Sequence, residues 1–139
     1  MITAVDTSVL LDVFADDPTF RGRSQAALRR CLAEGPLIAG DVVWAEVSAA
    51  FADASAAANA LRSIPVGYVA IGASAASRAG LAWRAYRASG GPRERVAADF
   101  LVGAHAQEHA ERLLTRDRGF HRAAFSGLVI VDPSTAGEG

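Results

Sequence analysis

The chain has 139 residues, of which 51% are hydrophobic and 21% are charged, and this balance excludes a disordered or fibrous protein. At this length one domain can bury enough apolar surface to fold without disulfides or structural metals. The single cysteine, Cys31, excludes an internal disulfide and a zinc site built on thiolates. We find no secretory leader and no apolar run of about 18 residues, so we expect a soluble, cytoplasmic protein with no membrane partner.

The formal net charge of −1 hides an uneven distribution, and all 14 basic residues are arginines. Residues 1–77 carry five arginines against eight acids, a balance of −3. Residues 78–139 carry nine arginines against seven acids, a balance of +2. Because the planar guanidinium pairs well with phosphate oxygens, the C-terminal part is the better place for contact with nucleic acid. An ordinary solvated surface is the simpler interpretation of the same charges.

Short apolar segments alternate with helical ones along the whole chain. In chain order the pattern predicts a strand at 2–5, helices at 9–15 and 19–35, a strand at 36–40, a helix at 42–64, a strand at 66–72, helices at 74–91 and 93–110, a strand at 112–115, a loop or helical turn at 116–125 and a strand at 128–132. Thr7 or Ser8 can cap the first helix and Asp41 the third. Residues 1–133 are expected to form the only domain, and residues 134–139 a disordered tail.

Strands that alternate with helices indicate a parallel sheet covered by helices on both faces. The predicted fold class is therefore α/β, a three-layer α/β/α sandwich with a parallel sheet of about five strands. Sites on such sheets form outside the carboxyl ends of the strands. Asp6 directly follows the first predicted strand, and Asp117 lies two residues beyond the fourth. We expect both carboxylates at the same edge of the sheet.

Two further acids stand among apolar neighbours, where an unpaired carboxylate is costly to bury. Glu46 lies in VVWAEVSAAF, and Asp99 lies in VAADFLVGAHA. If they shared a pocket with Asp6 and Asp117, the four groups would raise each other's pKa, and a divalent cation would remove that conflict. An all-oxygen ligand set favours Mg²⁺ or Mn²⁺. Such an ion can activate a water molecule and offset charge on a phosphodiester, so the hypothesis is metal-dependent phosphodiester hydrolysis.

Each of the four acids also has a simpler interpretation. Asp6 can cap the first helix, and Asp99 can cap a helix that begins late. Glu46 can face solvent, and Asp117 can sit in a turn. From the residues alone the shared pocket and these separate roles are both open.

The stretches that contain the four acids resemble a known set of motifs. AVDTSVLLD, VVWAEVSAAF, RERVAADFLVGAHA and LLTRDRGFHRAAF resemble the four acidic motifs of PIN-domain ribonucleases, and most closely those of the VapC-type toxins of bacterial toxin–antitoxin systems. The resemblance runs from about Ile2 to about Asp132, with the motifs in the same order. Four motifs in order are far more specific than any one of them.

The resemblance implies a catalytic and metal-binding set of Asp6, Glu46, Asp99 and Asp117, with Ser8 and Thr115 in support. It implies a PIN-like parallel sheet and an endoribonuclease, dependent on Mg²⁺ or Mn²⁺, that cuts structured RNA such as tRNA or ribosomal RNA. It also implies a homodimer and a cognate antitoxin, which would inhibit the enzyme by placing a peptide in the active-site groove.

Four arginines close to the last two motifs are the candidates to bind the RNA substrate: Arg93, Arg95, Arg116 and Arg118. They owe this role to guanidinium chemistry alone. His121, in the same region, is expected on the surface. Trp83 and the other large aromatic residues at helical spacing are expected to pack in the core or in a dimer contact.

Two alternatives come from other functional classes. HAQEH places His105, Glu108 and His109 in the H-x-x-E-H order of inverted zinc peptidases, with the histidines one helical turn apart. That site needs a third, distant ligand, and the short remaining chain makes the interpretation weak. The other alternative is a non-catalytic module that binds RNA or a peptide in the same groove, with the acids in structural roles.

Overall fold

Five parallel strands form one sheet in the order β3-β2-β1-β4-β5. The structure, a computed structural model, describes residues 1–91 and 95–136. The strands are β1 (Thr3–Val5), β2 (Leu37–Ala39), β3 (Val66–Tyr68), β4 (Arg112–Leu114) and β5 (Ile130–Val131). β1, β2 and β4 are buried at every position, as expected for parallel strands covered on both faces.

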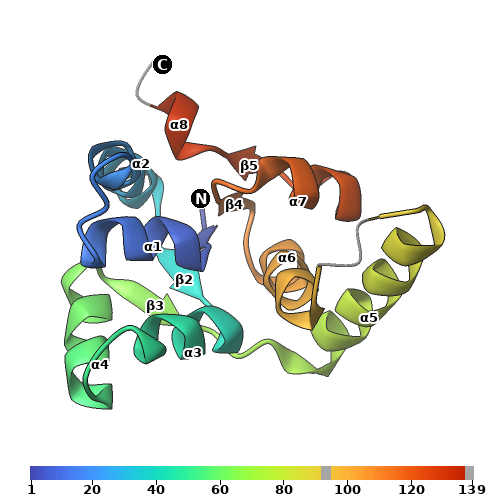
Figure 1. Cartoon of the computed structure of the whole chain (residues 1–139), viewed down its shortest axis with the longest axis horizontal. Helices are drawn as coiled ribbons and strands as arrows, with labels where there is room; N and C mark the ends of the chain where they lie inside the picture. The colour runs from blue at the N-terminus through green and yellow to red at the C-terminus, as the bar shows by residue number, and fades with distance from the viewer. Residues whose placement is uncertain (92–94, 137–139) are drawn as a thin grey trace.

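Helices cover both faces of the sheet, which confirms the predicted three-layer α/β/α class. They are α1 (Thr7–Phe14), α2 (Arg21–Glu34), α3 (Asp41–Ala49), α4 (Ala54–Ser63), α5 (Gly72–Ala88), α6 (Ala97–His109), α7 (Arg118–Ala124) and α8 (Pro133–Ala136). In Figure 1, α1 and α2 lie on one side of β1 and β2, and α5 and α6 lie on the other. Among the helices of the described residues, none has the length and apolar character needed to span a bilayer.

The predicted helices begin or end at other residues than expected, and two of the differences bear on the site. The helix predicted at 42–64 is divided into α3 and α4, because Asp53 caps α4 by accepting a hydrogen bond at Oδ1 from the Ala56 N–H at 2.8 Å. A side chain that binds the backbone in this way competes with helix continuation. Asp6, rather than Thr7 or Ser8, is the N-cap of α1.

The C-terminal region is more helical than the sequence pattern predicts. The segment expected as a loop or helical turn forms α7, and α8 covers residues 134–136 of the expected tail. Contacts between α2 and α8 hold that short helix against the domain. Residues 137–139 lie outside the described part of the chain.

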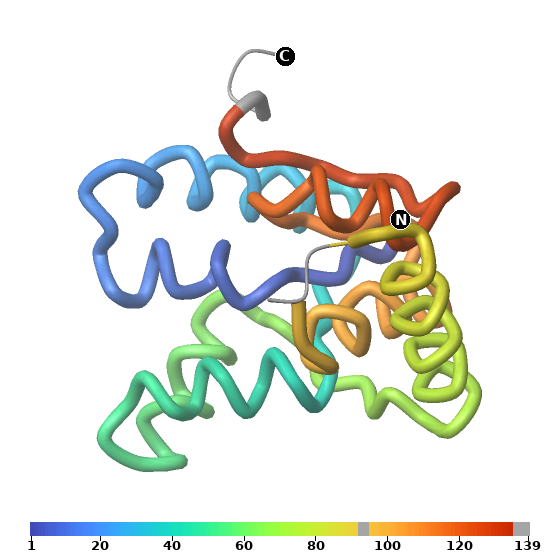
Figure 2. Tube along the Cα trace, turned by 45° about the vertical axis from the view of Figure 1, so that its right-hand side comes forward, coloured from blue at the N-terminus to red at the C-terminus, as the bar shows by residue number. Residues whose placement is uncertain are grey.

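A second apolar cluster lies between α5, α6 and α7, apart from the main core around the sheet. Its centre is Phe100, whose ring lies 5.1 Å from that of Phe120 and 5.8 Å from that of Trp83. Figure 2 shows α5 running beside α6, the helix pair that this cluster joins. Gly103 permits close packing here, because a Cβ at that position would lie 2.2 Å from a ring carbon of Phe125.

Gly103→Ala should therefore lower the free energy of unfolding by about 1–3 kcal/mol, because the Phe125 ring would have to move in a close-packed cluster. Gly80→Ala is the matched control: it also lies inside a helix, and a Cβ there would meet no atom within 4 Å. The control should raise stability by about 0.5–1 kcal/mol through helix propensity. Urea denaturation measures both, and a stabilised Gly103→Ala variant would contradict the packing described.

Candidate metal centre

The candidate site lies at the point where the strand order of the sheet reverses, between β1 and β4. Successive strands run from β1 through β2 to β3 on one side, and the chain then returns to β4 on the other side of β1. Asp6 follows β1 directly, and Thr115 follows β4 directly. The Thr115 Oγ1 donates a hydrogen bond to Asp6 Oδ2 at 2.7 Å. The two strand ends therefore meet through side chains at the switch point, where parallel sheets commonly bind ligands.

Two more acids join this junction through hydroxyl groups. Thr7 Oγ1 donates to Glu46 Oε1 at 2.7 Å, and the Thr7 backbone N–H donates to Asp6 Oδ1 at 2.8 Å. Thr7 thus connects the first motif to α3. On the other side, the Asp117 N–H donates to Thr115 Oγ1 at 3.0 Å, so this one hydroxyl connects Asp6 and the start of α7.

Arg95 provides the positive charge between the last two acids. Its guanidinium forms a two-pronged hydrogen bond with Asp117, with Nη2 donating to Oδ1 at 3.1 Å and Nη1 donating to Oδ2. The Nη1 also lies 3.9 Å from Asp99 Oδ1. The hydrogen bond to Asp117, assisted by the charges of Asp117 and Asp99, outweighs burial and raises the pKa of Arg95. Its guanidinium carbon lies 4.4 Å from the ring centre of Phe120, which fixes it from the other side.

Asp99 lies in the first turn of α6 and helps to cap it, although the N-cap residue is Val96, and not Asp99 as its simpler interpretation had it. Its Oδ2 accepts a hydrogen bond from the Val96 N–H at 3.2 Å, and α6 begins at Ala97, later than predicted. The cap and the contact with Arg95 coexist because they use different oxygens. Asp6 likewise is both the N-cap of α1 and a member of the acid cluster.

His121 lies at the buried floor of the site, and its expected surface position is wrong. The side chain is 3% exposed, and its Nε2 lies 3.7 Å from Asp6 Oδ2. Burial alone would raise the pKa of Asp6. The contacts with His121, Thr115 and the Thr7 backbone outweigh burial, so the pKa of Asp6 falls below its usual 3.8. Asp6 is therefore a carboxylate at neutral pH.

The four acids thus form one continuous chain of contacts, in the order Glu46, Thr7, Asp6, Thr115, Asp117, Arg95, Asp99. They are not gathered around one point: in the described residues no three His, Cys, Asp or Glu side chains are close enough to hold a metal ion. The donor chemistry nevertheless fits a hard cation, since every candidate ligand is an oxygen. Asp99 and Asp117 already share one cation, the Arg95 guanidinium.

The chain of contacts reaches solvent at both of its ends. Glu46 is exposed, as its simpler interpretation suggested, and the side chains of Asp99 and Asp117 are 34% and 39% exposed, whereas that of Asp6 is 16% exposed. A ligand approaching from solvent would therefore reach Glu46, Asp99 or Asp117 before Asp6.

Other residues proposed from the sequence lie elsewhere. The Ser8 hydroxyl is buried and has no hydrogen-bond partner among the described residues. Its neighbour Thr7 contacts an acid of the site in its place, through the hydrogen bond to Glu46. Arg118 lies 3.6 Å from Asp132. Arg93 falls outside the described residues. The sequence pattern did not indicate Thr7 or His121 as members of the site. Two signals pointed to them: Thr7 places a hydroxyl directly after Asp6, and His121 lies one helical turn after Asp117.

Arg116 stabilises the fold through a buried ion pair, rather than being free to bind RNA. Its Nε and Nη2 donate to the two carboxylate oxygens of Asp12, each at 2.9 Å. The Asp12 side chain is 3% exposed, and it also accepts a hydrogen bond from Ser24 at 2.6 Å. The guanidinium lies 4.1 Å from the ring centre of Phe20. These contacts tie the end of β4 to α1 and α2.

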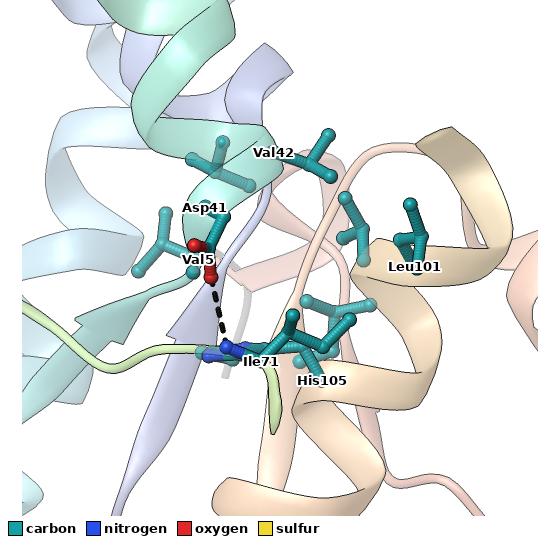
Figure 3. A pocket seen from close by; sticks show the side chains of 11 residues that line it. Val5, Asp41, Val42, Ile71, Leu101 and His105 are labelled. Atoms are coloured by element: carbon teal, nitrogen blue, oxygen red, sulfur yellow. Dashed lines mark hydrogen bonds between the residues drawn. The ribbon is translucent and has the colours of Figure 1, made fainter. Parts of the chain in front are cut away.

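The two histidines of the H-x-x-E-H motif hold a loop in place. The Nε2 atoms of His105 and His109 each lie 2.8 Å from a backbone carbonyl oxygen, of Val69 and Ile71 respectively. Asp41 holds the same loop by accepting the Ile71 N–H at 2.8 Å (Figure 3). The cavity beside them has a volume of about 10 Å³, room for no more than one water molecule. Both histidines that the zinc-peptidase interpretation needs as metal ligands therefore have structural roles instead.

Arg116→Ala should lower the free energy of unfolding by about 2–4 kcal/mol, because it leaves the buried Asp12 carboxylate without its cation. Arg21→Ala is the control, because the ion pair of Arg21 with Asp16 is exposed on both sides, at 49% and 81%, and an exposed ion pair contributes about 1 kcal/mol or less. Thermal and urea denaturation of the two variants give the comparison. Equal losses would show that the Asp12 pair is no stronger than a surface contact.

His105 should make stability depend on pH. Burial lowers the pKa of His105 below 6.5, and His109 adds to this effect, while the Val69 carbonyl and Asp41 oppose it. Below about pH 6.5 the unfolded chain binds a proton that the folded chain resists, so stability falls with pH in this window. His105→Gln removes that linkage. The stability advantage of the wild type over His105→Gln should shrink between about pH 7.5 and pH 5.5. A constant difference across this range would refute the assignment.

The comparisons with known proteins agree with this geometry. The PIN domain model matches residues 3–126, which contain all four acids. None of the curated protein sequences compared with the chain matches it significantly.

Several solved structures have the same fold. VapBC2 from Rickettsia felis, bound to a DNA fragment from their promoter, matches with a TM-score of 0.74 and 17% identity over 95% of this chain and 98% of that chain. FitAcB from Neisseria gonorrhoeae has a TM-score of 0.70 and 22% identity, over 96% and 99% of the two chains. VapBC-1 from nontypeable Haemophilus influenzae has a TM-score of 0.68 and 15% identity, over 96% and 99%. Because the family match spans nearly the whole chain, this protein belongs to the PIN domain family.

Proposed function

We propose that this protein is an endoribonuclease that depends on Mg²⁺ or Mn²⁺ and that it is the toxin of a type II toxin–antitoxin pair. PIN domains are generally nucleases, and this coarser activity follows from the family. The observation that carries the finer proposal is the chain of contacts that joins Asp6, Glu46, Asp99 and Asp117 at the carboxyl edge of the sheet. The proposed substrate is structured RNA such as tRNA or ribosomal RNA.

The four acids would hold the metal, and their neighbours would set their charge and orientation. When bound, Mg²⁺ or Mn²⁺ supplies a Lewis acid that activates water and offsets charge on the phosphodiester. The low pKa of Asp6 keeps its carboxylate ionised and ready to bind a cation. The hydroxyls of Thr7 and Thr115 orient Glu46 and Asp6, because each donates to one carboxylate oxygen at 2.7 Å. Such hydrogen bonds to ligating carboxylates commonly tune metal affinity.

Arg95 has a second role in the proposed reaction. Its guanidinium neutralises Asp117 and Asp99 while no other cation is near them. A phosphate oxygen entering the site can replace those carboxylates as its partner, because a guanidinium binds both groups in the same two-pronged way. Arg95 would thereby orient the scissile phosphate as the acids turn to the metal.

The toxin assignment and the partners are supported by the similar solved structures and by the motifs of this chain. The similar solved structures from Rickettsia felis and Haemophilus influenzae are named VapBC2 and VapBC-1, and the motifs of this chain resemble VapC-type toxins. We therefore propose a cognate antitoxin, a homodimer and a cytoplasmic location for this protein.

The test is cleavage of total RNA with Mn²⁺, with EDTA, and by two variants. Asp6→Asn and Asp99→Asn should each reduce the cleavage rate by at least about 100-fold, because each removes a charged ligand from the metal site. Asp16→Asn is the control, since the Asp16 side chain is 81% exposed and pairs only with Arg21 among the described residues. Gel electrophoresis of the RNA measures the rates, and calorimetry measures Mn²⁺ binding.

Cutting that persists in EDTA would refute the metal requirement. Cutting by both acid variants at the wild-type rate would refute the site. RNA binding without any cleavage would favour the non-catalytic binding module.

A further inference from the structure

Three of the four arginines proposed from the sequence to bind RNA contact acids in the structure, whereas two arginines of α5 do not. Arg95, Arg116 and Arg118 each contact a carboxylate. Arg84 and Arg87, on the last turns of α5, are exposed, and within the described residues neither is paired with an acid. The segment 72–91 contains no acid at all. Within residues 78–139, the exposed arginines that have no acidic partner among the described residues are therefore Arg84 and Arg87 on α5 and Arg122 on α7.

These two arginines line an open groove together with Trp83 and Arg95. The groove has a volume of about 990 Å³, at the upper end of the range for ligand sites. Ala88, Gly90 and Gly91 are its other described lining residues, and none of the three has a large side chain. Of the described residues that line the groove, three carry a guanidinium and none carries a carboxylate.

The groove wall holds its arginines in place. The Arg87 guanidinium carbon lies 5.1 Å from the ring centre of Trp83, and the Trp83 ring stacks on Phe100 in the α5–α6 cluster. Arg84 and Arg87 stand three residues apart on one helix, so their side chains are neighbours, and their like charges repel each other. A polyanion that contacts both guanidinium groups would offset this repulsion. A single carboxylate that pairs with only one of the two arginines would offset less of it.

Arg95 belongs both to this groove and to the chain of acids. It lines the groove, and its guanidinium contacts Asp117 and Asp99, the two acids at one of the two exposed ends of the site. A strand whose phosphates lie on Arg84 and Arg87 would therefore continue to Arg95 and then to the carboxylates. The groove therefore offers positive charge to the phosphates of an approaching strand, which the negatively charged acids would repel.

We propose that the groove lined by Trp83, Arg84, Arg87 and Arg95 binds the phosphodiester backbone of a single-stranded segment of the structured RNA substrate and directs it to the acids. This inference rests on the proposed ribonuclease function and names where its substrate is held. Contacts from guanidinium groups to phosphates carry no sequence information, so the groove sets the path of the strand and leaves base recognition to other residues. Electrostatic grooves of this kind are typical of proteins that bind single strands.

The test is the binding of a fluorescein-labelled 12-nucleotide oligouridylate to the full chain in EDTA, measured by fluorescence anisotropy at several salt concentrations. EDTA separates binding from cleavage. The double variant Arg84→Gln, Arg87→Gln should weaken binding by about tenfold or more at low salt. It should also reduce the slope of log affinity against log salt by about 1.4, which corresponds to two phosphate contacts on a single strand.

The matched control is Arg29→Gln, Arg30→Gln. It removes the same charge from adjacent exposed positions on α2, across the sheet from α5, where within the described residues neither arginine is paired with an acid (Figure 1). Because arginine and glutamine have similar helix propensities, both double variants should fold, and circular dichroism checks this. If the α5 double variant does not fold, Arg84→Gln alone leaves Arg87 over Trp83 and should show about half the change in slope.

The outcomes separate the groove from the proposed function. Equal weakening of RNA binding by the α2 and α5 variants, or unchanged binding by the α5 variant, would overturn the proposal that the groove binds RNA. Neither result would contradict the proposed ribonuclease function. An α5-specific loss of binding in a protein that cuts no RNA with Mn²⁺ would uphold the groove and refute the ribonuclease. Cleavage by the wild type together with an α5-specific loss is the expected result.

Discussion

The hydrogen bond from Thr115 to Asp6 joins the carboxyl ends of β1 and β4, and the rest of the site is arranged around it. The two strands pair in register, so the residues that follow them emerge side by side although 109 positions separate them in the chain. From this junction Thr7 reaches Glu46 and Asp117 begins α7. A parallel sheet collects strand ends at one edge, and here that edge collects carboxylates.

Collecting carboxylates in a partly buried place creates an electrostatic cost, and this chain meets it with arginines and hydrogen-bond donors. Arg95 neutralises Asp117 and Asp99, Arg116 neutralises the buried Asp12 behind the site, and Asp6 accepts hydrogen bonds from Thr115 and from the Thr7 backbone. An acid cannot stay ionised in a low-dielectric setting without such a partner. The same need explains why three of the arginines that looked available for RNA are engaged, because their positions near the acids are also the positions where a counter-charge is required.

The sequence was sufficient for the fold class and for the expectation that Asp6 and Asp117 lie at the same edge of the sheet, because both depend on patterns that a chain displays directly. The metal-binding role of the four acids stays a prediction. Asp6 and Asp117 follow apolar strands, and Asp99 stands out in an apolar helix. The side-chain partners were not predictable. Which of Thr7 and Ser8 faces Glu46 depends on where α1 begins, and that was set by Asp6 acting as the cap. The burial of His121 depends on how α7 packs, and no local pattern gives that direction.

Arg95 is the residue where the electrostatics of the site and of the groove meet. In the structure its guanidinium satisfies Asp117 and Asp99, so neither acid is an uncompensated charge. In the proposed nuclease the same two acids turn to a metal and the same guanidinium turns to a phosphate. Each of these groups would exchange one partner of opposite charge for another, so neither the acids nor the guanidinium would be left without a counter-charge. A ligand can shift such an arrangement only by the difference between its contacts in the two states. Metal and phosphate would therefore favour each other's binding, because each takes a partner that the other sets free.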